Sequence, residues 1–304
     1  MTVVVPSYNG RAFVADAIGS IRSADRGDAV DILLVDDASE DDTPMFVADT
    51  FPDIRVHRIA RNVGEAVARN TGLARATTDF VTFLDQDDVV LPDHFTTMLR
   101  GMDAGYEAVA PASVSFSATE RLDMLVLASD QFSGRETAPN PCQPFRSIAE
   151  SEAAEGGISN TVFASREALI SAGGFTPFTR GTGDYMLLWN LSRTCRLAKA
   201  TVPTLGYRLH PEMSTFRYNM APNILSCRVG LRVAGATPGA SAWDVQMVAG
   251  AGAAGGVRPG SIADAIAFGR LVGLHGRQWF GVMKRIVKAG SAERAPIGSK
   301  QRNR

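Results

Sequence analysis

The first hundred residues alternate between short apolar runs and longer segments whose apolar residues recur at helical spacing. The runs are rich in Val, Ile, Leu and Phe, residues that favour strands. We expect four strands, at residues 2–6, 31–37, 54–60 and 79–85. We expect a helix after each strand, at residues 11–23, 43–51, 64–76 and 92–105. This alternation predicts an α/β fold, a mainly parallel sheet with helices on both faces.

Polar side chains follow three of these strands at the point where each one ends. They are Ser7 to Asn9, the pair Asp36 and Asp37, and the run Asp85 to Asp88. In open parallel sheets, ligands bind outside the carboxyl ends of the strands. A solvated loop would explain any one cluster, but three clusters on one edge favour a ligand site.

The middle of the chain is less regular. Five elements are expected there, namely a strand at 108–117, a proline-rich loop at 133–147, a strand and helix at 159–175, a helix at 184–192 and an extended stretch at 200–211. Gly173 or Gly174 would supply the left-handed residue that ends the helix before it.

Composition excludes several classes of protein. The formal charge of −1 over 304 residues gives no support to nucleic-acid binding. Three widely spaced cysteines argue against a disulfide framework or a zinc site and fit a reducing, cytoplasmic location. The opening MTVVVPSYNG does not read as a signal peptide, and no apolar run is long enough to predict a membrane-spanning helix.

Seven segments occur in an order that resembles the inverting glycosyltransferases of family 2, which have the GT-A fold. They are VVVPSYNG, VDDASEDDT, NVGEAVARNTGL, LDQDDVVLPDHF, SNTVFASREALISAGGF, GTGDYMLLWNL and YRLHPEMS. The resemblance covers roughly residues 2–216 and implies sugar transfer from a nucleotide-diphospho-sugar, usually with a divalent metal. We therefore expect a catalytic domain at 1–216, a helical C-terminal extension at 217–290 and a disordered tail at 291–304.

The acidic run fits the metal that the resemblance implies. A departing diphosphate gains charge, and hard cations such as Mg²⁺ or Mn²⁺ prefer carboxylate oxygens. Side chains alternate along an extended segment, so Asp85 and Asp87 would point one way and Asp88 the other. The resemblance makes Asp87 a direct metal ligand, and Asp85 a residue that meets the ribose and the metal. His210 resembles a late histidine near the metal. A solvent-facing acidic turn is the alternative. We expect a structural role for Asp88, for instance as the cap of the following helix.

The resemblance also assigns residues to the donor. Asp37 would accept a hydrogen bond from a pyrimidine base, which favours UDP- or dTDP-sugars. Pro6, Ser7 and Tyr8 would frame that base, with packing as the alternative for Tyr8. Arg69 would contact the diphosphate or hold a catalytic carboxylate, unless it is an ordinary surface arginine. The nucleotide-sugar-binding set is thus Pro6, Ser7, Tyr8, Asp37, Asn62, Arg69, Asp85 and Gln86.

Inverting transfer needs a general base that takes the proton of the acceptor hydroxyl. Asp184 resembles that base. The family usually has an acidic residue just before it, where this chain has Gly183. The orientation and pKa of Asp184 therefore stay open.

The acceptor is expected to be a glycan, a lipid-linked sugar or a small molecule such as a secondary metabolite, as in polysaccharide biosynthesis. Two other functions stay open, a nucleotidyltransferase and a nucleotide-sugar-binding module that has lost catalysis. A basic amphipathic helix at 261–289 would pack on protein or lie on the inner face of a membrane. Association into a homo-oligomer is left open.

Overall fold

The computed structural model describes residues 1–25, 27, 30–117, 141–145, 161–177 and 182–213. The chain divides into two compact units, Met1–Met220 and Ala221–Arg304. All described residues belong to the first unit. The helix expected at 261–289 and the tail expected at 291–304 lie outside the described residues.

The expected alternation of strands and helices is present. The strands are β1 Thr2–Ser7, β2 Asp31–Asp36, β3 Arg55–Arg58, β4 Phe80–Phe83, β5 Val89–Val90, β6 Ala108–Ser117, β7 Cys142–Pro144, β8 Phe163–Ser165 and β9 Leu197–Leu209. The helices are α1 Val14–Ala24, α2 Thr43–Thr50, α3 Glu65–Arg75, α4 His94–Asp103, α7 Arg166–Ser171 and α8 Gly183–Thr194. Among the described residues, no helix is long and apolar enough to cross a membrane.

One sheet runs through the described part of the chain in the order β3-β2-β1-β4-β8-β6-β9-β5, and β7 pairs with β9. The first four of these strands are parallel. Beyond β4 the sheet is mixed, because β8 runs antiparallel to both β4 and β6 while β6 and β9 run parallel. The predicted α/β class is confirmed, and its parallel half is the half that alternates with helices along the sequence.

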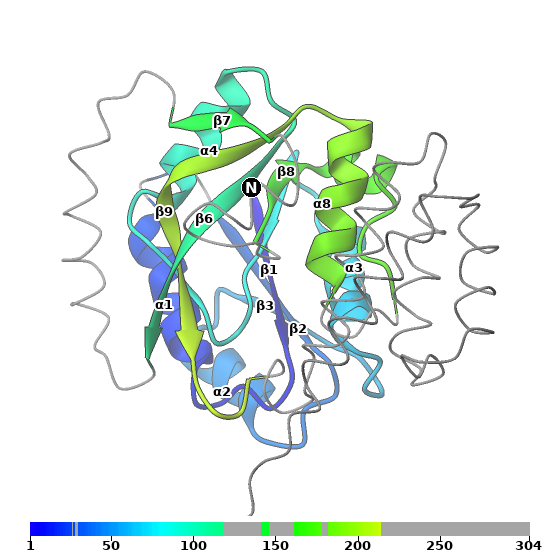
Figure 1. Ribbon diagram of the computed structural model, residues 1–304. Coiled ribbons are helices and arrows are strands. Elements are labelled where there is room, and N and C mark those ends of the chain that lie inside the picture. Colours follow the sequence, from blue (N-terminus) through cyan, green and yellow to red (C-terminus); the bar gives the residue numbers. More distant parts are fainter. Residues whose placement is uncertain (26, 28–29, 118–140, 146–160, 178–181, 214–304) are drawn as a thin grey trace, which may run out of the picture. The chain divides into compact units, whose positions relative to one another are not determined.

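The carboxyl ends of β1, β2 and β4 reach one edge of the sheet. Ser7 pairs with Asp36 at the ends of β1 and β2, and Val4 pairs with Phe83 at the end of β4. In Figure 1 the arrowheads of β1 and β2 point to the lower edge. The three polar clusters therefore meet at this edge, as the sequence predicts.

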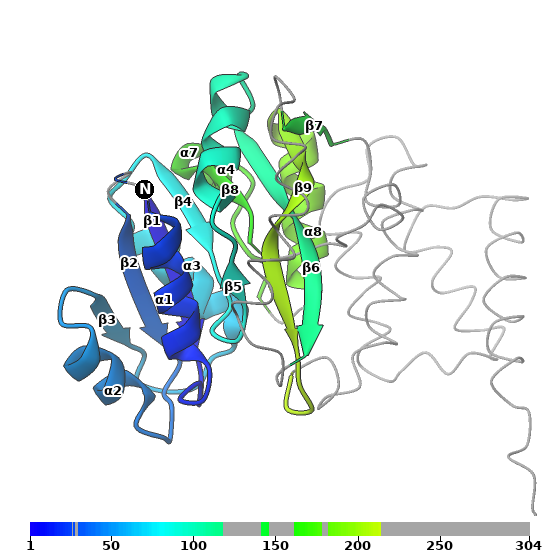
Figure 2. The same ribbon diagram turned by 90° about the vertical axis from the view of Figure 1, so that its left-hand side faces the viewer.

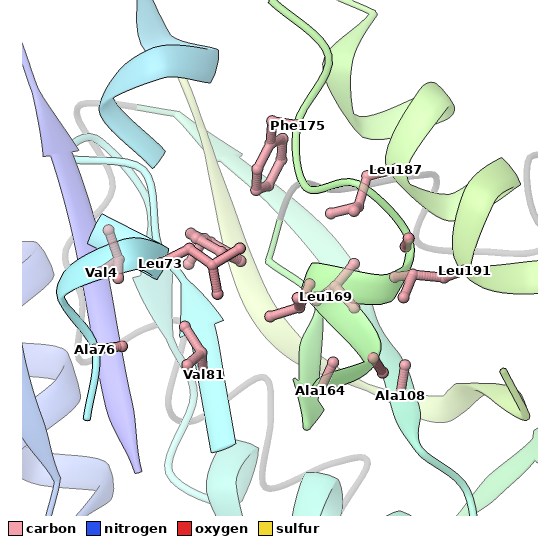
Figure 3. Close-up of a cluster of buried hydrophobic side chains, with 14 of the residues drawn as sticks. Val4, Leu73, Ala76, Val81, Ala108, Ala164, Leu169, Phe175, Leu187 and Leu191 are labelled. Atoms are coloured by element: carbon pink, nitrogen blue, oxygen red, sulfur yellow. The ribbon is translucent and has the colours of Figure 1, made fainter. Parts of the chain in front are cut away.

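In the parallel half, β1, β2 and β4 are buried on both faces, whereas β3 at the edge is partly exposed. Val3 and Val5 of β1 pack with α1 and α2 on one face, and Figure 2 shows α1 in front of this strand. Val4 packs with α3 on the other face, in a cluster that also takes in Leu169 of α7 and Leu187 of α8. Figure 3 shows the side chains of this second cluster converging from the three helices and the sheet. Burial on both faces explains the continuous apolar runs of these strands.

Two turn predictions have clear outcomes. Gly173 (φ +84°) and Gly174 (φ +64°) both take the left-handed conformation expected after α7. The loop expected over 133–147 is wrong in one part, because Cys142–Pro144 forms β7, which pairs antiparallel with β9. Pro144 is tolerated there because β7 lies at an edge of the sheet, where one side needs no ladder hydrogen bond.

Candidate active site

The acidic run after β4 is a turn and not an extended segment. The strand ends at Phe83, and the amide of Asp88 donates to the carbonyl of Asp85 at 3.1 Å. The expectation that alternation would divide the run into two sides is therefore wrong in its geometry. Four consecutive side chains, from Asp85 to Asp88, instead contact three different parts of the fold. We call residues 85–88 the acidic turn.

Asp85 faces α3. Its Oδ1 accepts a hydrogen bond from Nη2 of Arg69 at 2.5 Å. Arg69 is only 1% exposed, so it is not a surface arginine. Burial by itself would lower the pKa of Arg69. Three nearby carboxylates outweigh burial and raise that pKa; they belong to Asp85, Glu65 and Asp184. Arg69 thus holds the carboxylate of Asp85. Its two predicted roles, contact with the diphosphate or with the catalytic carboxylate, stay predictions.

Gln86 faces the end of β1. Its Oε1 accepts hydrogen bonds from Oγ of Ser7 at 2.7 Å and from the amide of Tyr8 at 3.0 Å. Its Nε2 donates to the carbonyl of Tyr8 at 3.0 Å. A Cβ on Gly10 would lie 2.0 Å from Oε1, so only glycine leaves room for this contact. The amide of Gln86 binds the chain itself and fastens the acidic turn to β1.

Asp87 faces the end of β9. Its Oδ2 lies 3.0 Å from Nε2 of His210. Burial and the charge of Asp85 raise the pKa of Asp87, and the hydrogen bond to His210 opposes that rise. The His210 ring also packs on Phe13, with ring centroids 4.5 Å apart. The structure thus brings together two of the three predicted metal ligands.

Asp88 also faces β9, and the expectation that it caps a helix is wrong. Its Oδ1 accepts from the backbone amide of Arg208 at 3.0 Å. Helix α4 begins at His94, and its N-cap residue, Asp93, makes no side-chain capping bond. Burial raises the pKa of Asp88 well above the usual value, the charges of Asp87 and Asp85 add to the rise, and Arg208 opposes it.

Asp37 lies at the end of β2, where both carboxylate oxygens accept backbone hydrogen bonds. The amides of Val63 and Gly64 donate to them at 2.9 and 2.8 Å. Burial raises the pKa of Asp37, and these two bonds oppose the rise. Asp37 therefore fixes the loop before α3, and each oxygen keeps a further lone pair for a ligand.

The other predicted donor residues divide by exposure. Pro6 and Ser7 are buried, whereas Asn62 is exposed and Tyr8 is 37% exposed. Tyr8 is thus partly covered by packing and partly open at the rim, and its contact with the base stays a prediction. Asn62 lies in the loop that Asp37 holds.

Asp184 lies in the first turn of α8 and is partly buried. Burial raises the pKa of its carboxyl to about 7. The amide of Tyr185 donates to its Oδ1 at 2.8 Å and opposes that rise. Charges on Glu65, Arg69 and Asp85 also act on it. The carboxyl of Asp184 thus responds to the charges of Arg69 and of Asp85 in the acidic turn.

Two further residues shape the site although the sequence did not single them out for this. Asn70 accepts from the amide of Phe175 at 2.8 Å and donates to its carbonyl at 2.7 Å. A Cβ on Gly174 would lie 2.6 Å from Oδ1 of Asn70. Arg208 is buried beside the acidic turn. The motifs that contain these residues were a signal, but their partners lie more than a hundred residues away.

The side chains of Asp87 and His210 are a partial ligand set that fits a divalent cation also bound by substrate. Among the described residues, no group of three or more His, Cys, Asp or Glu side chains is arranged to hold a metal. Mg²⁺ and similar ions are commonly held by one or two carboxylates together with substrate phosphates and water. Asp87, 26% exposed, and His210 converge as such a partial set. Asp85 lies beside it in its ion pair with Arg69.

Comparisons with known proteins concern the sequence and the fold of the chain. The sequence model of the family described as "Glycosyl transferase family 2" matches residues 2–169. The succinoglycan biosynthesis protein ExoO of Rhizobium meliloti (strain 1021) is 40% identical over 112 residues, which are 36% of this chain. The matched stretch spans only about a third, 32%, of that relative's length.

Two solved structures share the fold. TarS 1–349 of S. aureus in complex with UDP-GlcNAc superposes with a TM-score of 0.61 at 14% identity, over 94% of this chain and 82% of that one. The mannosyltransferase PcManGT of Pyrobaculum calidifontis, in complex with GDP-Man and Mn²⁺, gives a TM-score of 0.53 at 21% identity, over 95% and 85% of the two chains. At these identities the likeness establishes the fold.

Proposed function

Because the chain belongs to glycosyl transferase family 2, we propose that it moves a sugar from a nucleoside-diphosphate donor to an acceptor hydroxyl with inversion at the anomeric carbon. The observation that carries the proposal is the acidic turn, where Asp87 meets His210 at 3.0 Å and Asp85 pairs with the buried Arg69. The acidic turn suits a diphosphate with its cation, and Asp184 suits proton removal from an acceptor.

The donor lies, in this proposal, along the carboxyl ends of β1 and β2. Tyr8 is exposed there to pack on a base, and Asp37 keeps lone pairs for a base N–H. These features support UDP- or dTDP-sugars. Pro6 and Ser7 form the floor, while Asn62 lies in the loop that Asp37 holds.

Asp87 and His210 would hold Mn²⁺ or Mg²⁺ together with oxygens of the diphosphate, with Asp85 beside them. A bound cation stabilises negative charge on the departing nucleoside diphosphate. Gln86 and Arg69 keep the turn in place through their bonds to β1 and to Asp85.

Asp184 would take the proton of the acceptor hydroxyl as that oxygen attacks the anomeric carbon. A general base works best when its pKa lies near the operating pH, and burial brings the pKa of Asp184 to about 7. Gly183 stands where the family usually has an acidic residue, so no neighbouring charge from that position raises the pKa further.

The acceptor in this proposal is a sugar hydroxyl of a growing polysaccharide, free or lipid-linked, made at the cytoplasmic side of the membrane. The similarity to ExoO, a succinoglycan biosynthesis protein, supports this class. A small-molecule acceptor is the other outcome of an acceptor screen.

The test is transfer and donor hydrolysis with UDP-, dTDP- and GDP-sugars in the presence of Mn²⁺ or Mg²⁺. We expect nucleoside diphosphate release that stops with EDTA, and a product of inverted configuration by NMR. Asp87→Ala and Asp184→Asn should both abolish transfer. A product of retained configuration, or full activity in both variants, would refute the mechanism. Nucleotide binding with metal but no turnover would indicate a binding module.

A further inference from the structure

Arg208 lies on β9, two residues before His210, and its side chain is only 5% exposed. A buried charge is costly unless its partners are well placed. The partners of Arg208 come from the acidic turn and from α1, so this one residue joins three parts of the fold.

Arg208 makes two hydrogen bonds with the acidic turn. The backbone amide of Arg208 donates to Oδ1 of Asp88 at 3.0 Å, and its Nε donates to the carbonyl of Asp87 at 2.8 Å. Asp87 is thereby held by its main chain, and its carboxylate is left to face His210. The residue that binds the main chain of Asp87 therefore lies on the strand that leads directly into His210.

Its contacts with α1 complete the arrangement. Nη2 of Arg208 donates to Oδ2 of Asp16 at 2.9 Å. The guanidinium lies 5.2 Å from the Phe13 ring and 4.7 Å from the Phe116 ring. Phe13 also packs on the His210 ring. The Phe13 ring thus contacts both Arg208 on β9 and His210, which directly follows this strand.

We propose that Arg208 is a positioning residue that fixes the separation of Asp87 and His210 and so sets the affinity of this site for a divalent cation. The proposal rests on the proposed function. Nε and Nη2 both bind the protein and the side chain is buried, so Arg208 acts through Asp87 and not by contact with the donor. Lysine has one ammonium group and does not reproduce the planar set of N–H donors of the guanidinium, which binds Asp87 and Asp16 together.

The experiment measures Mn²⁺ dissociation constants by titration, alone and with saturating UDP. Residues that orient metal ligands typically change metal affinity by about 10- to 100-fold when replaced. We expect Arg208→Lys to weaken Mn²⁺ binding about tenfold, at the lower end of that range. Asp16→Asn keeps an acceptor and should weaken binding less than Arg208→Lys. At saturating Mn²⁺, Arg208→Lys should recover most of its kcat, because Asp184 is untouched.

Two control variants separate positioning from general stability. Arg55→Lys makes the same chemical change in a half-exposed ion pair with Asp31. Met98→Ala opens the core near Met1 and Phe80, at the amino ends of β1 and β4. Neither should alter Mn²⁺ affinity, although Met98→Ala should lower Tm.

Wild-type Mn²⁺ affinity in Arg208→Lys, with a Tm loss like that of Met98→Ala, would overturn the inference. Absence of Mn²⁺ binding by the wild type, alone and with UDP, would overturn it together with the metal assignment. Mn²⁺ binding that depends on Arg208 in a protein without transferase activity would support the inference and refute the proposed function.

Discussion

Two buried arginines hold the acidic turn from opposite sides by different means. Arg69, on α3, binds the side chain of Asp85 and lies among three carboxylates. Among the described residues, its Nε and Nη1 make no hydrogen bond. Arg208, on β9, binds a main-chain carbonyl of the turn and ties it to Asp16.

The difference shows which property matters on each side. On the α3 side, the charge of Arg69 balances the carboxylates of Asp85 and Asp184, so the local electrostatics depend on it. On the β9 side, the N–H groups of Arg208 bind Asp87 and Asp16 at fixed angles, so the position of Asp87 depends on Arg208. Lysine keeps the positive charge but lacks the planar set of N–H donors. Replacement by lysine should therefore affect the site more at Arg208 than at Arg69.

The largest expected effect is on the α3 side, in Asp184→Asn. Loss of a general base costs about 10²- to 10⁴-fold in kcat. Wild-type activity should rise with pH through about 7, because a base acts only when ionised. Steady-state kinetics between pH 5.5 and 8.5 would check this, and a flat wild-type profile would contradict it.

The same variant should be more stable than the wild type at neutral pH. The folded-state pKa of Asp184 is raised, from a usual 3.8 to about 7, so burial favours the neutral carboxyl. Wild-type stability is therefore lost as pH rises from about 4 to about 7, and Asn, which is always neutral, avoids that loss. The Tm advantage of Asp184→Asn should be absent near pH 4 and constant above pH 8.

The next effect concerns Arg69 itself. Arg69→Met leaves the buried side of Asp85 without its cation and should cost about 3–5 kcal/mol in the free energy of unfolding. Arg69→Lys should cost less, since it keeps the charge. Urea unfolding of both variants measures this. If Arg69→Lys impaired Mn²⁺ binding as much as Arg208→Lys does, the contrast between the two sides would fail.

The smallest effect lies between the two sides, in Gln86→Ala. The variant loses the hydrogen bonds to Ser7 and Tyr8, a net loss of about 1–2 kcal/mol in stability. We expect a higher KM for the donor, because the β1 end is loosened, and little change in Mn²⁺ affinity. Gln143→Ala, at an exposed position on β7, is the matched control. An unchanged donor KM would contradict the assigned role of Gln86.

Local patterns predicted the parallel half of the sheet well. Period and composition are properties of neighbouring residues, and β1, β2, α3 and β4 each carry a clear pattern. The meeting of the polar clusters at one edge was predicted from a general rule for parallel sheets. Contacts within a few residues agree with this local character, since Asp41 accepts from the amide of Thr43 at the start of α2 at 3.0 Å.

The conformation of the acidic turn was not predictable in this way. Extending the strand period past Phe83 gave the wrong geometry, because the chain turns where four side chains find partners elsewhere. The partner of Asp88 is 120 residues away, and that of Asn70 is 105 residues away. No window of local sequence contains both members of such a pair. The assignments of Asp184, Asp87 and the donor residues came from the family resemblance and stay predictions.

The pairing of Asp87 with His210 spans 123 residues of sequence. Contacts of such separation require closure of a long loop and form late when they depend on strands that must first dock. The proposed cation site depends on the docking of β9, because Arg208 lies on this strand and His210 directly follows it. Cation binding at Asp87 and His210 would then report that β9 has docked beside the acidic turn.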